Sequence, residues 1–140
     1  MRYFVLDCSV TAAWFFEDEF NPYVRRVRSL LLEYDTTAVV PAIWSAEVAN
    51  VLFQAERRNR ILPEKVNEGL RLLSQLPIET DLLPMSQMGH VLHLCRKHML
   101  TSYDALYLEI TLRRDIPLAT QDKKLKAAAN LAGASLVSRS

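Results

Sequence analysis

The sequence predicts an α/β fold, a single doubly wound domain with a mostly parallel sheet flanked by helices. Stretches typical of strands alternate with stretches typical of helices along all 140 residues, as in chains of βαβ units. The first strand-like stretch, residues 3–6, is continuously apolar, which is expected of a strand that helices cover on both faces. No repeat, low-complexity tract or linker interrupts the pattern. We therefore assign residues 1–140 to one domain, long enough to bury about 70% of its unfolded surface.

Local signals place the boundaries of the elements. Asn21 and Pro22 predict a helix start, with Asn21 as N-cap and Pro22 at the first helical position. Ser9 is expected to cap the helix that follows the first strand, and Pro41 and Gly133 stop elements. Five strands are expected, at residues 3–6, 36–40, 78–80, 116–120 and 134–137. Helices are expected at residues 10–16, 22–34, 42–60, 63–75, 86–99, 102–114 and 122–132.

Apolar periodicity predicts which helical residues face the core. With about 3.6 residues per turn, each helix places residues three and four apart on one side. The residues predicted to point inward are Trp44, Val48, Val51, Leu52 and Ala55 in one helix, Met88, Val91, Leu92, Cys95 and Met99 in another, and Leu108 and Leu112 in a third.

Composition limits the class of protein. No apolar run approaches the roughly 18 residues of a membrane span. The first residues lack the long apolar stretch of a secretory signal, so we expect a cytoplasmic protein without membrane association. Cys8 and Cys95 are too few for a disulfide framework, and we expect reduced thiols.

Basic residues are grouped although the net charge is only +1. Such groups could contact the phosphates of a nucleic acid, or they could be ordinary solvated helix faces. The groups lie at residues 25–28, 57–60, 96–97, 113–114 and 123–126.

Four acidic residues occupy comparable places in the predicted fold. Asp7 and Asp122 follow the ends of predicted strands. Glu47 lies at the margin of the apolar stripe of its helix, and Asp104 falls in the first turn of its helix. In a doubly wound sheet such positions can converge on the crevice at the carboxyl ends of the strands. Each acid also has a purely structural interpretation, as a helix cap or as a surface carboxylate beside an arginine.

Converging carboxylates would require a cation or protons. Two carboxylates roughly 5 Å apart repel by about 3 kcal/mol at an effective dielectric near 20. An all-oxygen ligand set suits Mg²⁺ or Mn²⁺ better than zinc, and such an ion can orient a water and neutralise charge at a phosphodiester. A zinc site at His90, His93 and His98 is not expected, because Cys95 belongs to the core stripe and no second cysteine lies near it in sequence.

Four motifs in this order resemble a known family. They are LDCSV at residues 6–10, SAEVAN at 45–50, TSYDALYLE at 101–109 and TQDKKL at 120–125. Together they are similar to PIN-domain ribonucleases, in particular to the VapC-type toxins of toxin–antitoxin pairs. The resemblance spans nearly the whole chain.

The resemblance implies a fold, an activity and partners. The fold would have a five-stranded sheet of order 3-2-1-4-5. The activity would be endonucleolytic cleavage of RNA that depends on Mg²⁺ or Mn²⁺. The partners would be a second copy of the chain in a homodimer and a cognate antitoxin protein that inserts a peptide near the active site.

The resemblance also implies roles for individual residues. Lys124 stands where some members carry a further acid, so one metal ion is expected rather than two. The acidic, metal-binding and catalytic set is Asp7, Glu47, Asp104 and Asp122, and the supporting polar residues are Ser9, Asn50 and Thr120.

Two other classes fit part of the pattern. A phosphoaspartate phosphatase needs a second Asp two residues after the first, where this chain has Ser9, and a receiver domain needs an acceptor Asp at the end of the third strand. A non-catalytic RNA- or partner-binding module with the same fold is the other alternative. All four acids are present, which favours the enzyme.

Overall fold

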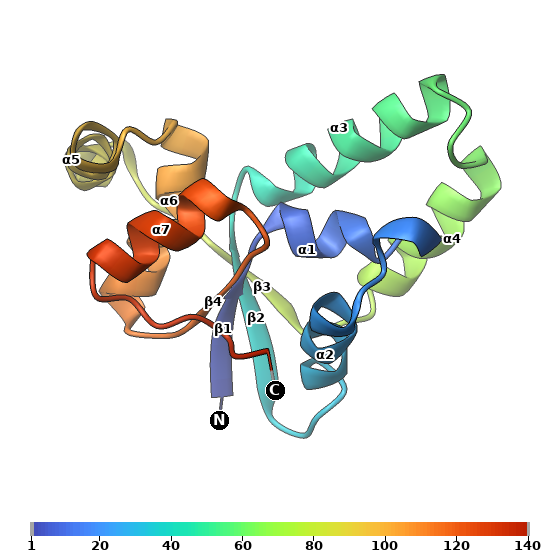
Figure 1. Ribbon diagram of the computed structural model, residues 1–140, viewed down its shortest axis with the longest axis horizontal. Coiled ribbons are helices and arrows are strands. Elements are labelled where there is room, and N and C mark those ends of the chain that lie inside the picture. Colours follow the sequence, from blue (N-terminus) through green and yellow to red (C-terminus); the bar gives the residue numbers. More distant parts are fainter. Residues whose placement is uncertain (1, 140) are drawn as a thin grey trace.

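The sheet of this protein is parallel throughout and has four strands in the order β3-β2-β1-β4. The structure, a computed structural model, describes residues 2–139. Figure 1 shows the sheet in the middle of the molecule, with β1 beside β2. The strands are β1 (Arg2–Leu6), β2 (Thr36–Pro41), β3 (Ile78–Asp81) and β4 (Leu118–Ala119).

The predicted five-stranded sheet of order 3-2-1-4-5 is wrong for the described residues. The segment expected as a fifth strand, residues 134–137, makes a single parallel bridge, between Leu118 and Leu136. Its backbone bonds run from Leu118 N to Ser135 O (2.9 Å) and from Val137 N to Leu118 O (2.8 Å). Because β4 is only two residues long, it offers too few backbone groups for a longer ladder.

Helices cover both faces of the sheet, as a doubly wound fold requires. In Figure 1, α1 to α4 lie on one side of the sheet and α5 to α7 on the other. The first group comprises α1 (Cys8–Ala13), α2 (Pro22–Leu30), α3 (Trp44–Arg57) and α4 (Pro63–Leu73). The second comprises α5 (Met88–His98), α6 (Ser102–Arg114) and α7 (Lys123–Leu131), and the short 3₁₀ turns are η1 (Glu17–Glu19) and η2 (Met85–Gln87).

The central strands are the core of the molecule. Val5 and Leu6 of β1 and Val39 of β2 are completely buried, which confirms the prediction of a first strand covered on both faces. On α6, Tyr107 and Leu108 are also completely buried and pack against this core. The carboxyl ends of β1 and β4 are therefore held in a fixed position, where the candidate site lies.

Several boundaries differ from the sequence-based prediction for local reasons. The first helix begins at Cys8, and its N-cap position is Asp7 rather than Ser9. Asn21 caps α2 as predicted, accepting a bond from Val24 N at 2.9 Å. Asn59 has a positive φ of 58°, so α3 ends before it rather than at residue 60.

Four residues predicted to face the core are exposed. They lie at the edges of their apolar stripes or at a helix end, where neighbouring elements do not reach. Met99, for example, is the left-handed C-cap residue of α5 and is 73% exposed. The four are Val51, Leu92, Met99 and Leu112.

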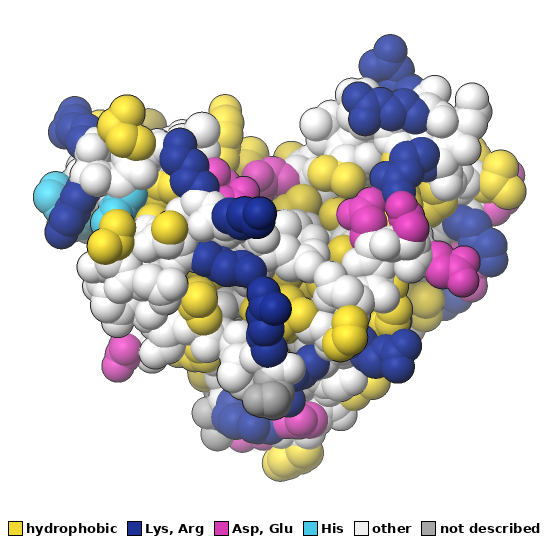
Figure 2. Space-filling view, viewed as in Figure 1, with side chains coloured by type: hydrophobic (Ala, Val, Ile, Leu, Met, Phe, Trp, Pro, Cys, Tyr) yellow, Lys and Arg dark blue, Asp and Glu magenta, His cyan; other side chains and the backbone are white. Residues whose placement is uncertain are grey.

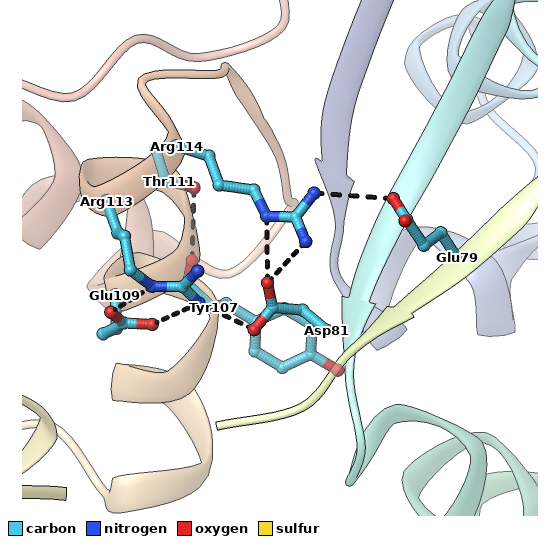
Figure 3. Close-up of polar contacts among 7 residues, drawn as sticks. All are labelled: Glu79, Asp81, Tyr107, Glu109, Thr111, Arg113 and Arg114. Carbon is cyan, nitrogen blue, oxygen red and sulfur yellow. Dashed lines mark hydrogen bonds and ion pairs between the residues drawn. The ribbon is translucent and has the colours of Figure 1, made fainter. Parts of the chain in front are cut away.

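A network of charged side chains joins the end of α6 to β3 (Figure 3). Asp81, the last residue of β3, accepts hydrogen bonds from Arg113 Nη2 (2.6 Å) and Arg114 Nε (2.9 Å). Arg113 also pairs with Glu109, one turn earlier on α6, at 2.8 Å. Burial alone would raise the pKa of Asp81, but the two arginines outweigh it and lower that pKa. The network therefore fixes the C-terminal end of α6.

Candidate active site

The surface is hollowed between two lobes above the carboxyl ends of the central strands. In Figure 2 the hollow lies at the top of the view, between the lobe formed by α3 and α4 and the lobe formed by α5, α6 and α7. Acidic side chains lie beside it, and Lys and Arg side chains lie on both lobes.

Asp7 lies directly after β1 and is 5% exposed. Its Oδ2 accepts two hydrogen bonds, from Ser9 Oγ at 2.6 Å and from Thr120 Oγ1 at 2.7 Å. Ser9 lies in the first turn of α1, just after β1, and Thr120 directly follows β4. Because β1 and β4 pair in parallel, both hydroxyls lie at the carboxyl end of the sheet. Ser9 and Thr120, which the sequence predicts as supporting residues, therefore both contact Asp7.

The segment after β4 wraps around these hydroxyls. Gln121 N donates to Ser9 Oγ at 3.0 Å, and Gln121 Nε2 donates to the Ser9 carbonyl at 3.2 Å. Asp122 N donates to Thr120 Oγ1 at 3.1 Å. Asp122 Oδ1 in turn accepts from Leu125 N at 2.8 Å, so Asp122 is the N-cap of α7. No local sequence signal points to Gln121, because its partner Ser9 is 112 residues away along the chain.

Glu47 comes from the first turn of α3 and is half-buried. Its Oε1 accepts a hydrogen bond of 2.6 Å from the hydroxyl of Tyr107 on α6. Burial, and then the bond to Glu47, raise the pKa of Tyr107, so the phenol is the donor. Sequence analysis did not predict a role for Tyr107. Its place in the motif at residues 101–109, three after Asp104, was the signal that could have indicated one.

Asp104 lies in the first turn of α6, as predicted, and is half-buried. Thr101 is the N-cap of this helix, and its Oγ1 accepts a bond from Asp104 N at 3.2 Å. The N-cap role is therefore filled by Thr101 rather than by Asp104.

The acids influence one another electrostatically. Burial is the main cause that raises the pKa of Asp7, and the charge of Asp122 raises it further, against the hydrogen bonds that lower it. Burial likewise raises the pKa of Glu47, with further contributions from Asp7 and Asp104. For Asp104, burial raises the pKa first, followed by Asp122 and Asp7. The four acids that the sequence places far apart thus lie close enough to repel one another.

A family model, described as PIN domain, matches residues 4–131 of this chain. The chain belongs to the PIN-domain family. The crystal structure of PAE2754 from Pyrobaculum aerophilum matches with a TM-score of 0.71 over 91% of this chain and 79% of that chain, at 19% identity. At this identity the likeness shows the fold. Comparison with curated proteins gave no significant match.

Membership in the PIN-domain family confirms the broader part of the resemblance. PIN domains are generally nucleases and generally use divalent metal ions, and a role on nucleic acid follows from the family. Within residues 2–139, no helix is long and apolar enough to cross a membrane.

The acids of this PIN domain fit a divalent cation by their chemistry, although they are not gathered into a coordination shell. Among the residues that the structure describes, no three His, Cys, Asp or Glu side chains are placed so as to hold a metal ion. The donors are all carboxylates. The charges of neighbouring acids help to raise the pKa of Asp7, Glu47 and Asp104, and the charge of Lys124 partly offsets this effect at Asp104.

Two further residues near the acids have other properties. Asn50, predicted as a supporting residue, is exposed on α3 one turn beyond Glu47, and no hydrogen bond within residues 2–139 joins it to the acids. Cys8 follows Asp7, and burial, with the charges of Glu47 and Asp7, raises the pKa of its thiol to about 12. Cys8 and Cys95 are both free thiols in the structure.

Proposed function

We propose that this PIN domain is an endoribonuclease that depends on Mg²⁺ or Mn²⁺, and that it is the toxin of a type II toxin–antitoxin pair. One observation carries the enzymatic part of the proposal: Asp7, Glu47, Asp104 and Asp122 come from separate elements to one end of the sheet, where the charges of neighbouring acids help to raise the pKa of Asp7, Glu47 and Asp104. Such a cluster is stabilised by binding a cation.

In this proposal Asp7 and Asp104 hold the ion, with Glu47 and Asp122 binding it directly or through water. When bound, the ion supplies positive charge to the phosphodiester and helps orient the attacking water. Ser9 and Thr120 hold one oxygen of Asp7 in place, so this carboxylate is oriented before substrate arrives. In-line attack leaves 3′-hydroxyl and 5′-phosphate ends.

Basic side chains beside the hollow would hold the RNA by its phosphates. Lys123 and Lys124 begin α7 next to Asp122, and Arg57 and Arg58 end α3 on the other lobe, all four exposed. Arg60 is less available, because it pairs with Asp18 and Glu19 and stacks on Phe16. The other proposed partners are a cognate antitoxin and a second copy of the chain, both of which the resemblance to VapC-type toxins implies.

Substitution of the acids tests the enzymatic proposal. Asp7→Asn and Asp104→Asn should each reduce Mn²⁺-dependent RNA cleavage by about 10²-fold or more, while the circular dichroism spectrum stays that of the wild type. Asp115→Asn is the matched control. Asp115 is exposed with φ of 53°, a conformation that asparagine also adopts, so this variant should cleave normally. Cleavage by both site variants at the wild-type rate would contradict the proposal.

The substrate is best identified in cells. Brief expression followed by mapping of RNA 5′ ends should show sites present with the wild type and absent with Asp7→Asn. Transfer, ribosomal and messenger RNA are all compatible with single-stranded regions entering the hollow.

A non-catalytic RNA-binding module is the second candidate function. The absence of a formed three-ligand group among the described residues favours it. RNA binding without cleavage at any Mn²⁺ concentration would support this candidate. A receiver domain does not fit, since its strand order is 2-1-3-4-5, whereas β3 here lies at the edge beside β2 and its terminal Asp81 is paired with two arginines.

A further inference from the structure

The hydroxyl of Tyr107 is a buried polar group that the reaction described above does not use. The Tyr107 side chain is completely buried within the core, and its one oxygen donates to Glu47 Oε1 at 2.6 Å. A phenylalanine would fill the same space without the cost of burying a polar atom. The hydroxyl therefore has a purpose that core packing alone does not explain.

Glu47 is held differently from the structural carboxylate of the same protein. Asp81 is neutralised by two guanidinium groups, as expected of an acid that only joins elements. Glu47 is half-buried, and within residues 2–139 no Lys or Arg pairs with it. Its partner is the neutral hydroxyl of Tyr107. A neutral donor orients a carboxylate and leaves its negative charge available to a cation.

Helix α6 carries both Asp104 and the tyrosine that is bonded to Glu47. Tyr107 is three residues after Asp104 on α6, so both side chains lie on one face of the helix. Glu47 belongs to α3, which lies on the other side of the sheet from α6 (Figure 1). The bond between Tyr107 and Glu47 thus sets the position of one acid relative to another.

We infer that Tyr107 is a positioning residue that holds Oε1 of Glu47, so that the carboxylate is oriented for the divalent ion of the proposed nuclease. This inference rests on the proposed function. Tyr107 touches neither the ion nor the RNA, and acts through Glu47.

Binding of Mn²⁺ to the full chain without RNA provides the first test. Tyr107→Phe should raise the Mn²⁺ dissociation constant about 10-fold, measured from the electron paramagnetic resonance signal of free Mn²⁺, as expected for loss of a hydrogen bond that orients a ligand. Tyr103→Phe is the matched control, because Tyr103 lies on the same helix and is 56% exposed. It should bind Mn²⁺ as the wild type does.

A double-mutant cycle separates positioning from a general structural effect. Glu47→Gln should weaken Mn²⁺ binding, and adding Tyr107→Phe to it should cause no further loss, because the residue through which the hydroxyl acts is already changed. Additive losses in the double variant would overturn the inference. So would wild-type Mn²⁺ affinity in Tyr107→Phe.

Failure of the inference is distinguishable from failure of the proposed function. If the wild type binds Mn²⁺ and cleaves RNA while Tyr107→Phe binds equally well, only the inference fails. If the wild type neither binds Mn²⁺ nor cleaves RNA, both fail. Should Tyr107→Phe not fold, Glu47→Asp replaces it: the shorter side chain keeps the charge but draws back from the hydroxyl. It should also bind Mn²⁺ about 10-fold more weakly, and unchanged affinity would overturn the inference.

Discussion

Two buried threonines have opposite hydrogen-bonding situations. Thr120 Oγ1 donates to Asp7 Oδ2 at 2.7 Å and accepts from Asp122 N at 3.1 Å. Thr36 is 5% exposed at the start of β2, and within residues 2–139 its Oγ1 has no hydrogen-bond partner. The Thr120 hydroxyl is a hydrogen-bond partner for both the Asp7 carboxylate and the backbone N–H of Asp122, whereas the Thr36 hydroxyl is itself unsatisfied within residues 2–139.

Replacing each threonine by valine should therefore have opposite effects on stability. Thr120→Val removes one of the two hydrogen bonds to the buried Asp7 carboxylate and leaves Asp122 N without this partner, so it should lower the free energy of unfolding by about 2 kcal/mol. Thr36→Val removes an unpaired polar atom with almost no change of shape, and should leave that free energy unchanged or raise it by about 1 kcal/mol. Urea unfolding of both variants measures the difference. Equal destabilisation by the two substitutions would contradict this account.

At the scale of elements, the charged network between α6 and β3 determines how the helix that carries Asp104 lies on the sheet. The Asp81 side chain is 4% exposed, whereas its partners Arg113 and Arg114 are 41% and 31% exposed. Glu79 pairs with Arg114 at 3.4 Å but is 49% exposed. The buried acid should therefore matter far more than the exposed one.

Asp81→Asn should lower the free energy of unfolding by about 2 kcal/mol at pH 7, through loss of charge-assisted hydrogen bonds. Because the pKa of Asp81 is lowered in the folded state, its stabilisation is present above the unfolded pKa of about 3.9 and is lost as the pH falls through the folded pKa. The difference from the wild type should thus be constant from about pH 6 to 7 and shrink below about pH 4. Chemical unfolding at several pH values measures it. Glu79→Gln is the control, with an expected effect below about 0.5 kcal/mol.

At the scale of the whole molecule, α3 and α6 belong to the two lobes on either side of the hollow (Figure 2), and each carries an acid with a raised pKa. A raised pKa means that the folded state favours the protonated acid, so the ionised acid opposes folding. The contribution of these acids to stability is full below the unfolded pKa and is lost as the pH rises through the folded pKa. At neutral pH a bound cation would offset this cost.

Addition of Mn²⁺ should therefore raise the thermal midpoint of unfolding. At a free concentration about 100 times the dissociation constant, binding to the folded state alone adds about 2.7 kcal/mol. Removal of the ion by a chelator should reverse the shift, and Asp104→Asn should show a much smaller one. Equal shifts in the wild type and Asp104→Asn would indicate binding elsewhere. Differential scanning calorimetry with and without Mn²⁺ measures this effect.

Local chemistry accounts for what the sequence by itself determined. A continuous apolar run identified β1 as a strand buried on both faces, and Asn21 before Pro22 identified the start of α2. The order of strands and helices placed Asp7 and Asp104 at comparable ends of their elements. Each of these signals lies within a few residues of the feature that it predicts.

Only the tertiary structure decided which distant groups meet. The bond from Tyr107 to Glu47 spans 60 residues and that from Thr120 to Asp7 spans 113, and no local pattern encodes a separation of that kind. The missing fifth strand has the same origin, because the pairing of residues 134–137 depends on how short β4 is once it is docked against β1. Packing brings these partners together, since a buried polar group must find a hydrogen-bond partner wherever along the chain that partner lies.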